Sequence, residues 1–309
     1  MQWSLGVVAA MAAIAVSGWS EREALAADPD PPAATIGPPP PAVHWHDDGQ
    51  RFTVLELMLS AAVTARNVDL GNHLEGPYST KIEGYVPILD QGGRDLFRAN
   101  THERRQGAKR LSDVGFRMMV FAPYAIDVGV GALAVHQNAD VAAQLALIDF
   151  EAFTFAGMTQ LLISRNIGRK RPWAETCRPG DCESGDPLRS FDGGHAMASF
   201  TAAGLMCLHH EKLPLFGGGA PDTWACAWAV SAATVTGTLR LVADEHWTSD
   251  VLLGAGLGWM YGYFLPKWLH FTSTSSRVAH VDARRSAVSW RPMFTGTAEG
   301  ATIGALGTF

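Results

Sequence analysis

The feature that most constrains this chain is a succession of long apolar segments from residue 113 onward. Each is longer than a typical β-strand of about 5–6 residues, and polar or glycine-rich loops separate them. The pattern predicts helices that pack as a bundle, so the expected fold class is all-α. The segments are 113–136, 141–167, 196–209, 223–241 and 249–271, preceded by expected helices at 52–68 and 95–110. Ser112 is the expected N-cap of the first apolar segment.

Charged residues bear on whether these helices cross a membrane. A span needs about 20 mostly apolar residues, but Asp127 interrupts the first segment, and Asp149 and Glu151 interrupt the second. Ionisable groups inside a span are costly. We therefore expect an exported helical domain that associates with a membrane, with a multi-span protein as the alternative.

The N-terminus is typical of an exported protein. Residues 5–16 form an apolar run of signal-peptide length, and Ala24-Leu25-Ala26 fits a small-residue cleavage site. We predict a signal peptide over 1–26, with an uncleaved anchor as the alternative, and a location in the periplasm or cell envelope. A Pro- and Ala-rich tether is expected over 27–50 and the helical domain over 51–285.

The C-terminus differs from the rest of the chain. Short segments at 288–294 and 302–309 are apolar or alternating, and a glycine-containing stretch separates them. Such a pattern predicts two strands. Residues 286–309 are therefore expected to form a short β-hairpin that covers the helical domain.

Four cysteines bear on redox state and metal binding. Cys177 and Cys182 share a polar loop that suits a local disulfide. Cys207 and Cys226 lie on two apolar segments, and two buried thiols are favoured there over a disulfide because Cys is a common core residue. None of the spacings matches a zinc site, so no metal is expected.

A histidine with charged neighbours stands out at 240–250. His246 and Asp250 are four residues apart and share one face of a helix. The carboxylate can accept the proton of one imidazole nitrogen and leave the other nitrogen free to attack. Arg240 just before them can bind two phosphate oxygens at once. Taken alone, these residues also fit an ordinary surface pair at a helix start.

Two other segments supply complementary groups. Arg171-Pro172 follows a helix end and brings positive charge to it. In Gly193-Gly194-His195, two glycines before a helix expose backbone N–H groups suited to an anion, and His195 is placed to protonate a leaving oxygen. The three segments together predict phosphoryl transfer through a phosphohistidine.

These segments resemble the three-part signature of the type 2 phosphatidic acid phosphatase (PAP2) and vanadium haloperoxidase superfamily. That signature is Lys, six residues and Arg-Pro, then Pro-Ser-Gly-His, then Ser-Arg, five residues, His, three residues and Asp. Order and spacing match from Ser164 to Asp250, and the resemblance covers about 52–271. The matching residues here are Ser164, Arg171-Pro172, Asp192-Gly193-Gly194-His195, Leu239-Arg240, His246 and Asp250.

The resemblance implies an exported helical phosphatase that works without a metal or other cofactor. His246 would be the nucleophile, Asp250 its orienting partner, and His195 the acid that protonates the leaving alcohol. The groups implied to hold the phosphate are Arg171, Arg240, Gly193 and Gly194.

Three positions depart from the family pattern. Ser164 stands where the family has Lys, which removes a phosphate-binding cation, while Gly193 and Leu239 each replace a serine. Losing one preorganised donor costs about 3 kcal/mol of transition-state stabilisation. The nearby cations considered as replacements are Arg165, Arg169 and Lys170.

The expected partner is a phosphorylated substrate, either a small phosphate monoester or a lipid phosphate or pyrophosphate. The alternatives are a vanadium-dependent haloperoxidase and a catalytically silent envelope protein that binds a lipid phosphate. Nucleic acid is not expected as a partner, because the net charge is −6 and no basic stripe stands out.

Overall fold

The computed structural model describes residues 43–45, 50–73, 87–177 and 186–272, together with the backbone of 289–297 and 300–308. The chain divides into two compact units, Met1–Thr272 and Ser273–Phe309. The predicted signal peptide and most of the predicted tether lie outside the described residues.

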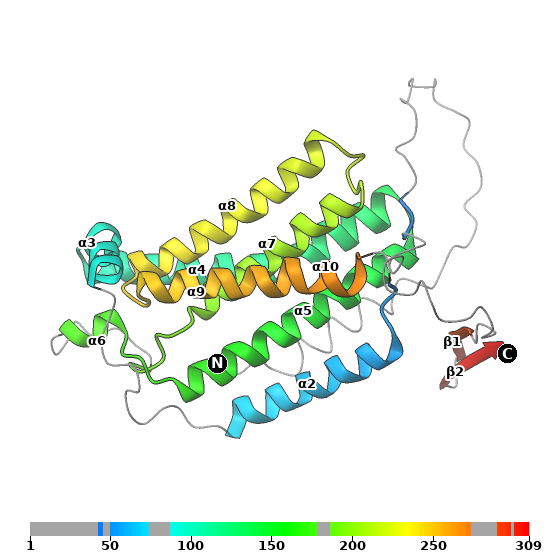
Figure 1. The fold of residues 1–309 in the computed structure, drawn as a ribbon, viewed down its shortest axis with the longest axis horizontal. Helices are drawn as coiled ribbons and strands as arrows, with labels where there is room; N and C mark the ends of the chain where they lie inside the picture. The colour runs from blue at the N-terminus through cyan, green and yellow to red at the C-terminus, as the bar shows by residue number, and fades with distance from the viewer. Residues whose placement is uncertain are drawn as a thin grey trace, which may run out of the picture. The chain divides into compact units, whose positions relative to one another are not determined.

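The first unit is a bundle of helices, which confirms the predicted all-α class. Its long helices run along a common direction (Figure 1). They are α2 (Val54–His73), α4 (His102–Ala122) continued by the π-helix η3 (Pro123–Val135), α5 (Ala139–Asn166), α7 (Gly194–Lys212), α8 (Ala220–Val242) and α9 (Thr248–Trp259). The short elements are η2 (Pro87–Gln91), α3 (Gly92–Phe97), α6 (Pro172–Thr176), η4 (Met260–Phe264) and α10 (Leu265–His270).

Helix α7 lies at the centre of the bundle and packs against α4, α5, α8 and α9. Glycines at every fourth position, Gly254, Gly258 and Gly262, form a stripe along α9 and η4. A Cβ at Gly258 or Gly262 would collide with the backbone carbonyl of Met197 or Thr201 in α7. The stripe therefore allows the two helices to approach closely and fixes the start of α9 beside the start of α7.

The start of α4 differs from the expected N-cap. The helix begins at His102, and its N-cap is Thr101, whose side chain accepts a hydrogen bond from the backbone of the first turn. Ser112 is buried inside the helix, where its hydroxyl donates to the carbonyl of Lys109 over 2.9 Å. The apolar pattern starts later than the helix because the first turns of α4 lie at the charged end of the bundle. Lys109 and Asp113 are four residues apart in α4 and therefore share one face of this helix.

The expectation of free thiols at Cys207 and Cys226 is wrong, because the two residues form a disulfide. Antiparallel packing of α7 and α8, joined by the short connection between them, brings the two side chains to the same height. Cys177 is disulfide-bonded as well, and its expected partner Cys182 lies outside the described residues. Disulfides persist in oxidising compartments.

The helical domain begins before residue 51. Val43 and Trp45, assigned from the sequence to the tether, are buried in the same apolar cluster as Phe52. The Trp45 ring packs on Phe271, with ring centroids 5.2 Å apart. The Pro- and Ala-rich composition that indicated a tether ends at residue 42. Residues 43–45, which follow it, already belong to the helical domain.

The second unit contains the predicted C-terminal hairpin. Strands β1 (Ser289–Thr297) and β2 (Gly300–Thr308) pair antiparallel, with Ser289 opposite Thr308 and Thr297 opposite Gly300.

Three helices of the described chain are long and apolar enough to cross a membrane: His102–Val135, Ala139–Asn166 and Ala220–Val242. Asp127 and Asp149, which interrupt the apolar runs in the sequence, are buried inside the bundle. Asp127 there accepts a hydrogen bond from His209 over 2.8 Å. Large apolar side chains are exposed on the outer faces of α4 and α8: Leu111, Val114, Met118, Phe121, Trp224, Trp228 and Val235. This apolar exterior supports membrane association.

Candidate active site

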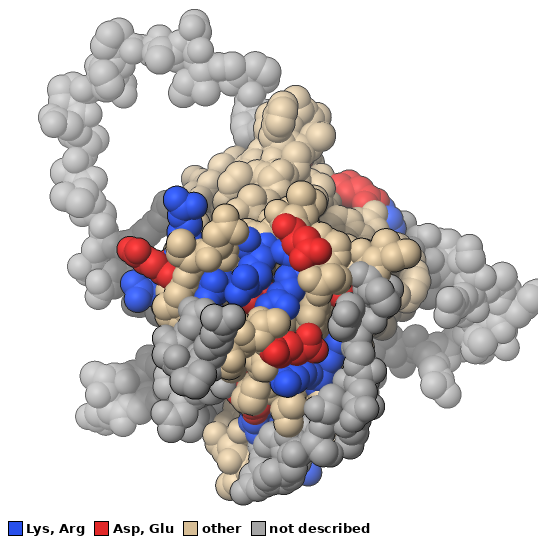
Figure 2. All heavy atoms as spheres, turned by 90° about the vertical axis from the view of Figure 1, so that its left-hand side faces the viewer, with Lys and Arg blue, Asp and Glu red and all other residues tan. Residues whose placement is uncertain are grey.

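The three predicted motif segments meet at one end of the bundle. This end carries α3 and α6, the C-terminus of α8 and the start of α9, at the left of Figure 1. Figure 2 faces this end and shows Lys and Arg side chains gathered there beside Asp and Glu. The structure thus brings together His195, His246, Arg171 and Arg240 from distant parts of the chain.

His246 lies in the short connection between α8 and α9 and is buried. Its Nδ1 is 2.6 Å from the carbonyl oxygen of Ser190. A carbonyl only accepts, so Nδ1 carries the proton and Nε2 keeps its lone pair. Burial, and then the positive charges of Arg171 and Arg240, hold the pKa of His246 well below 6.5. His246 is therefore a neutral imidazole whose Nε2 is available as a nucleophile.

Asp250 does not bind His246 in the manner expected from their spacing. Its carboxylate accepts from the hydroxyl of Ser190 over 2.6 Å and from the backbone N–H of Trp247 over 3.0 Å, and it pairs with Arg169. The carboxylate faces back over the first turn of α9, as in a capping box. Among the described residues, Ser190 is the link, since its side chain binds Asp250 and its carbonyl binds His246.

Arg169, a candidate for the missing phosphate-binding cation, has other partners. It is buried, and its Nη2 donates to Asp90 over 2.8 Å while its Nη1 binds Asp250. Arg165 donates to the carbonyl of Gly71 in α2 over 3.1 Å. Both arginines therefore hold the scaffold together, and Arg169 does so by joining η2 to α9.

His195, in the first turn of α7, is paired with a carboxylate. Its Nε2 is 2.8 Å from Oδ1 of Asp113, and its ring packs on Phe116 with centroids 4.7 Å apart. Burial and then Arg240 lower the pKa of His195, while Asp113 opposes that shift. Asp113 lies 82 residues away in sequence, so spacing did not assign it a role.

Two arginines of the motif set converge on Glu245, the residue before His246. Nη1 of Arg171 is 2.6 Å from Oε2 of Glu245, and Nη2 of Arg240 is 3.4 Å from the same oxygen. Nζ of Lys109 is 2.5 Å from the other oxygen, Oε1. Arg240 also pairs with Asp113 over 3.3 Å, so three cations face two carboxylates. One positive charge remains in excess beside His246, which suits a phosphate group.

Ser164 has no charge to offer a phosphate, but Lys109 is a further cation beside Glu245. The Ser164 hydroxyl donates to the carbonyl of Leu161 over 3.3 Å within its own helix. The third cation comes instead from α4, which the family pattern does not include. The sequence signature gives no sign of Lys109, because the signature residues lie only in and around α5, α7 and the α8–α9 connection.

The structure explains the glycine at position 193. Gly193 is the N-cap of α7 and has φ of 54°, a conformation that L side chains rarely adopt. A Cβ there would also lie 2.7 Å from the carbonyl oxygen of Asp250. The first intrahelical bond of α7 runs from Met197 N to Gly193 O over 3.1 Å. The earlier N–H groups, from Gly194 onward, thus point out of the helix N-terminus, where an anion is favoured.

Asp192, just before this turn, is a neutral acid. It is buried, and burial raises its pKa to about 8. Its backbone also lies in the left-handed region, with φ of 76°. At neutral pH the side chain is therefore mostly protonated and adds little negative charge near the cations around Glu245.

Comparison with protein families identifies one match over the motif region. Residues 146–273 match the family model described as the PAP2 superfamily. The match contains Arg171, His195, Arg240, His246 and Asp250, but it does not reach Lys109 or Asp113 on α4.

A curated relative and a solved structure are also similar. The chain is 32% identical over 97 residues to a lipid A 1-phosphatase of Porphyromonas gingivalis, a match that covers 31% of this chain and 18% of that protein. The match thus spans less than a fifth of that relative's length. A transmembrane PAP2 type phosphatidylglycerolphosphate phosphatase of Bacillus subtilis has 18% identity and a TM-score of 0.41, over 70% of this chain and 94% of that chain.

Proposed function

Because this chain belongs to the PAP2 superfamily, we propose that it is a lipid phosphatase that hydrolyses a phosphate monoester through a phosphohistidine at His246. The observation that supports this most directly is the neutral, buried imidazole of His246 beside Arg171 and Arg240. Its free Nε2 is a nucleophile, and the excess positive charge next to it suits a phosphate group.

In the first step, Nε2 of His246 attacks the phosphorus atom and the bond from phosphorus to the lipid oxygen breaks. The proton stays on Nδ1, which donates it in a hydrogen bond to the carbonyl oxygen of Ser190, and this bond stabilises the positive charge that develops on the ring. His195 gives its proton to the leaving oxygen, and Asp113 supports the protonated form of His195. A bound phosphate dianion favours that form further.

In the second step, water attacks the phosphohistidine. His195, now neutral, takes a proton from the water, and the bond from phosphorus to Nε2 breaks. Inorganic phosphate leaves, and His246 returns to its neutral form. Arg171, Arg240 and Lys109 neutralise the phosphate oxygens in both steps, and the phosphate takes over the ion pairs that these groups make with Glu245.

The apolar exterior beside the site supports a lipid as the substrate. Asp113 faces His195, while Leu111, Val114 and Met118 of the same helix are exposed. A lipid whose chains lie along the outside of α4 can present its phosphate at the end of the bundle. The curated relative is named as a phosphatase of the lipid A phosphate, which is consistent with this class.

We also propose that the protein acts on the outer side of the cytoplasmic membrane, in the periplasm or cell envelope. The disulfide between Cys207 and Cys226, and the disulfide-bonded state of Cys177, support an oxidising compartment. The predicted signal peptide over 1–26 is consistent with the same location.

The proposed function is tested by phosphate release from the full chain purified in detergent. Mixed micelles containing phosphatidic acid should release inorganic phosphate, with kcat/KM at least about 10-fold above that for a soluble alkyl phosphate, because only the lipid gains from the apolar surface. Binding of the lipid phosphate without any release would instead support a silent binding protein and overturn the assignment.

Lys109 is expected to serve as the phosphate-binding cation that Ser164 lacks. Lys109→Met should reduce kcat/KM by about 10²-fold, because one preorganised charge near the transferred phosphoryl group is lost. Steady-state kinetics on the same micelles measures this effect. Lys267→Met is the matched control, since Lys267 lies on α10 and pairs with Glu211 rather than with Glu245. Equal, small losses in the two variants would show that Lys109 does not bind phosphate.

A further inference from the structure

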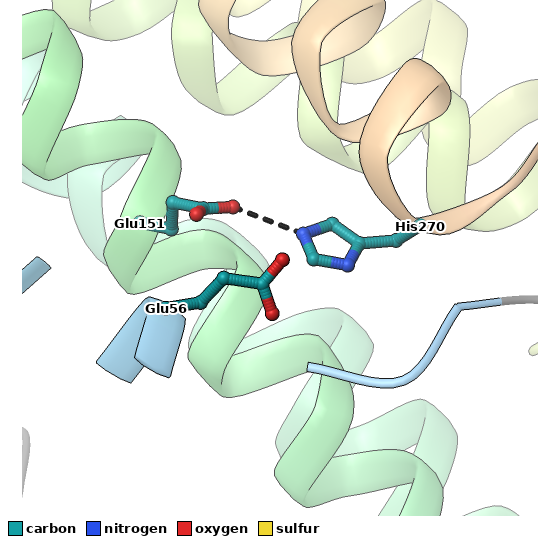
Figure 3. Close-up of side chains that lie close together, drawn as sticks. All are labelled: Glu56, Glu151 and His270. Carbon is teal, nitrogen blue, oxygen red and sulfur yellow. Dashed lines mark hydrogen bonds and ion pairs between the residues drawn. The ribbon is translucent and has the colours of Figure 1, made fainter. Parts of the chain in front are cut away.

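Three potential metal ligands meet away from the phosphate-binding cations. Glu56 of α2, Glu151 of α5 and His270 of α10 each place one ligand atom within 4.8 Å of the other two. Figure 3 shows both carboxylates turned toward the imidazole of His270. The three residues are far apart in the sequence, so no short motif predicts this cluster.

The cluster carries an excess of negative charge in apolar surroundings. Glu151 and His270 are 3% and 0% exposed, and the ring of Phe52 stacks on His270 with centroids 5.7 Å apart. Two carboxylates face one imidazole, so even an imidazolium leaves one negative charge uncompensated within the cluster. Such burial is costly unless the charge is neutralised. If the imidazole is neutral, a divalent cation balances the charges of the two carboxylates, and the net charge of the cluster is zero.

The hydrogen bonds of the cluster also suit a metal. Nε2 of His270 is 2.9 Å from Oε2 of Glu151. Nδ1 of His270 is buried and has no hydrogen-bond partner among the described residues. The Glu56 carboxylate is already oriented, since it accepts from the backbone N–H and the hydroxyl of Thr53 over 2.6 and 2.8 Å.

We propose that Glu56, Glu151 and His270 bind a structural Zn²⁺ that ties α2 and α10 to α5. An imidazole combined with carboxylates suits Zn²⁺ better than Mg²⁺ or Ca²⁺, which prefer oxygen ligands alone. Glu56 is half-buried, so the ion enters from its side, and water completes the coordination. The ion takes no part in the chemistry at His246.

Metal content and spectroscopy of the full chain in detergent test the site. After chelation and dialysis, the protein should bind about one equivalent of Zn²⁺, and Zn²⁺ should raise the Tm. Co²⁺, used as a visible probe, should give d–d absorption bands that Zn²⁺ displaces. Glu56→Gln should lower the Zn²⁺ affinity at least about 10-fold and abolish the Tm shift, because it removes a ligand charge.

Two controls keep the result specific. Glu103→Gln makes the same charge change on an exposed residue of α4 and should leave the Zn²⁺ affinity unchanged. His270→Gln should also remove the Co²⁺ bands, and if that variant fails to fold, Glu56→Gln at the half-buried position decides the question. Equal Zn²⁺ binding by the wild-type chain and Glu56→Gln, or the absence of Co²⁺ bands in the wild-type chain, overturns the proposal.

Discussion

Replacing His246 with alanine is expected to abolish phosphate release, with a loss in kcat of about 10⁴-fold or more. The physical reason is that no other group then forms the covalent intermediate, and the remaining rate comes from binding and charge stabilisation alone. Steady-state release of inorganic phosphate from lipid micelles measures this loss. His73→Ala, at the exposed end of α2, is the matched control and should keep full activity.

The intermediate itself gives a sharper test of the role of His246. Rapid quenching of the wild-type chain with ³²P-labelled lipid phosphate should trap a phosphoenzyme that is stable in base and labile in acid, as expected of a phosphoramidate. Because its pKa is held well below 6.5, His246 stays neutral as the pH falls toward 6, so trapping should persist in mildly acidic solution. Equal labelling of His246→Ala would place the nucleophile elsewhere.

The sequence indicated which residues come together at one end of the bundle, because the signature residues lie at helix ends. His195 lies in the first turn of α7, and His246 lies in the short connection between α8 and α9. Their spacing from neighbouring signature residues is therefore set by local turns of the chain. The close approach of these helix ends depends on small residues such as Gly258. Helix type and order could therefore be predicted from the sequence, together with the residues that meet.

Contacts between distant segments could not be predicted in the same way. Lys109 and Asp113 reach the site from α4, and only the packing of α4 against α7 and α8 shows that they do. The contact expected between Asp250 and His246 is not the one observed, for a related reason. A spacing of four residues permits contact with His246, but the carboxylate instead caps its own helix and holds Ser190.

Two of the departures from the family pattern have physical explanations in the fold. Ser164 lacks the cation of the family pattern, but Lys109 pairs with Glu245 beside Arg171 and is the cation that we propose in its place. The glycine at 193 is required by the left-handed turn and by the nearby carbonyl of Asp250. These departures therefore do not by themselves argue for an inactive protein, and the charge needed for phosphoryl transfer is present.

His195→Ala is expected to affect substrates according to their leaving groups. An alkyl oxygen is a poor leaving group without a proton, so release from a lipid phosphate should fall by about 10²–10⁴-fold. A p-nitrophenolate leaves without protonation, so p-nitrophenyl phosphate should lose much less, about 10-fold or below. The ratio of the two kcat/KM values, measured for the wild-type chain and the variant, isolates proton donation from binding.

Asp113→Asn also tests proton donation by His195, because Asp113 positions the His195 ring and does not touch the leaving group itself. Asp113 opposes the fall in the pKa of His195 that burial and Arg240 cause, so its loss should lower that pKa further. An acid must be protonated to act, and activity is lost as the pH rises through its pKa. The alkaline limb of kcat/KM on the lipid substrate should therefore move to lower pH in Asp113→Asn, with no such shift for p-nitrophenyl phosphate. Equal losses on both substrates in His195→Ala, with an unmoved alkaline limb in Asp113→Asn, would show that His195 binds phosphate but does not protonate the leaving group.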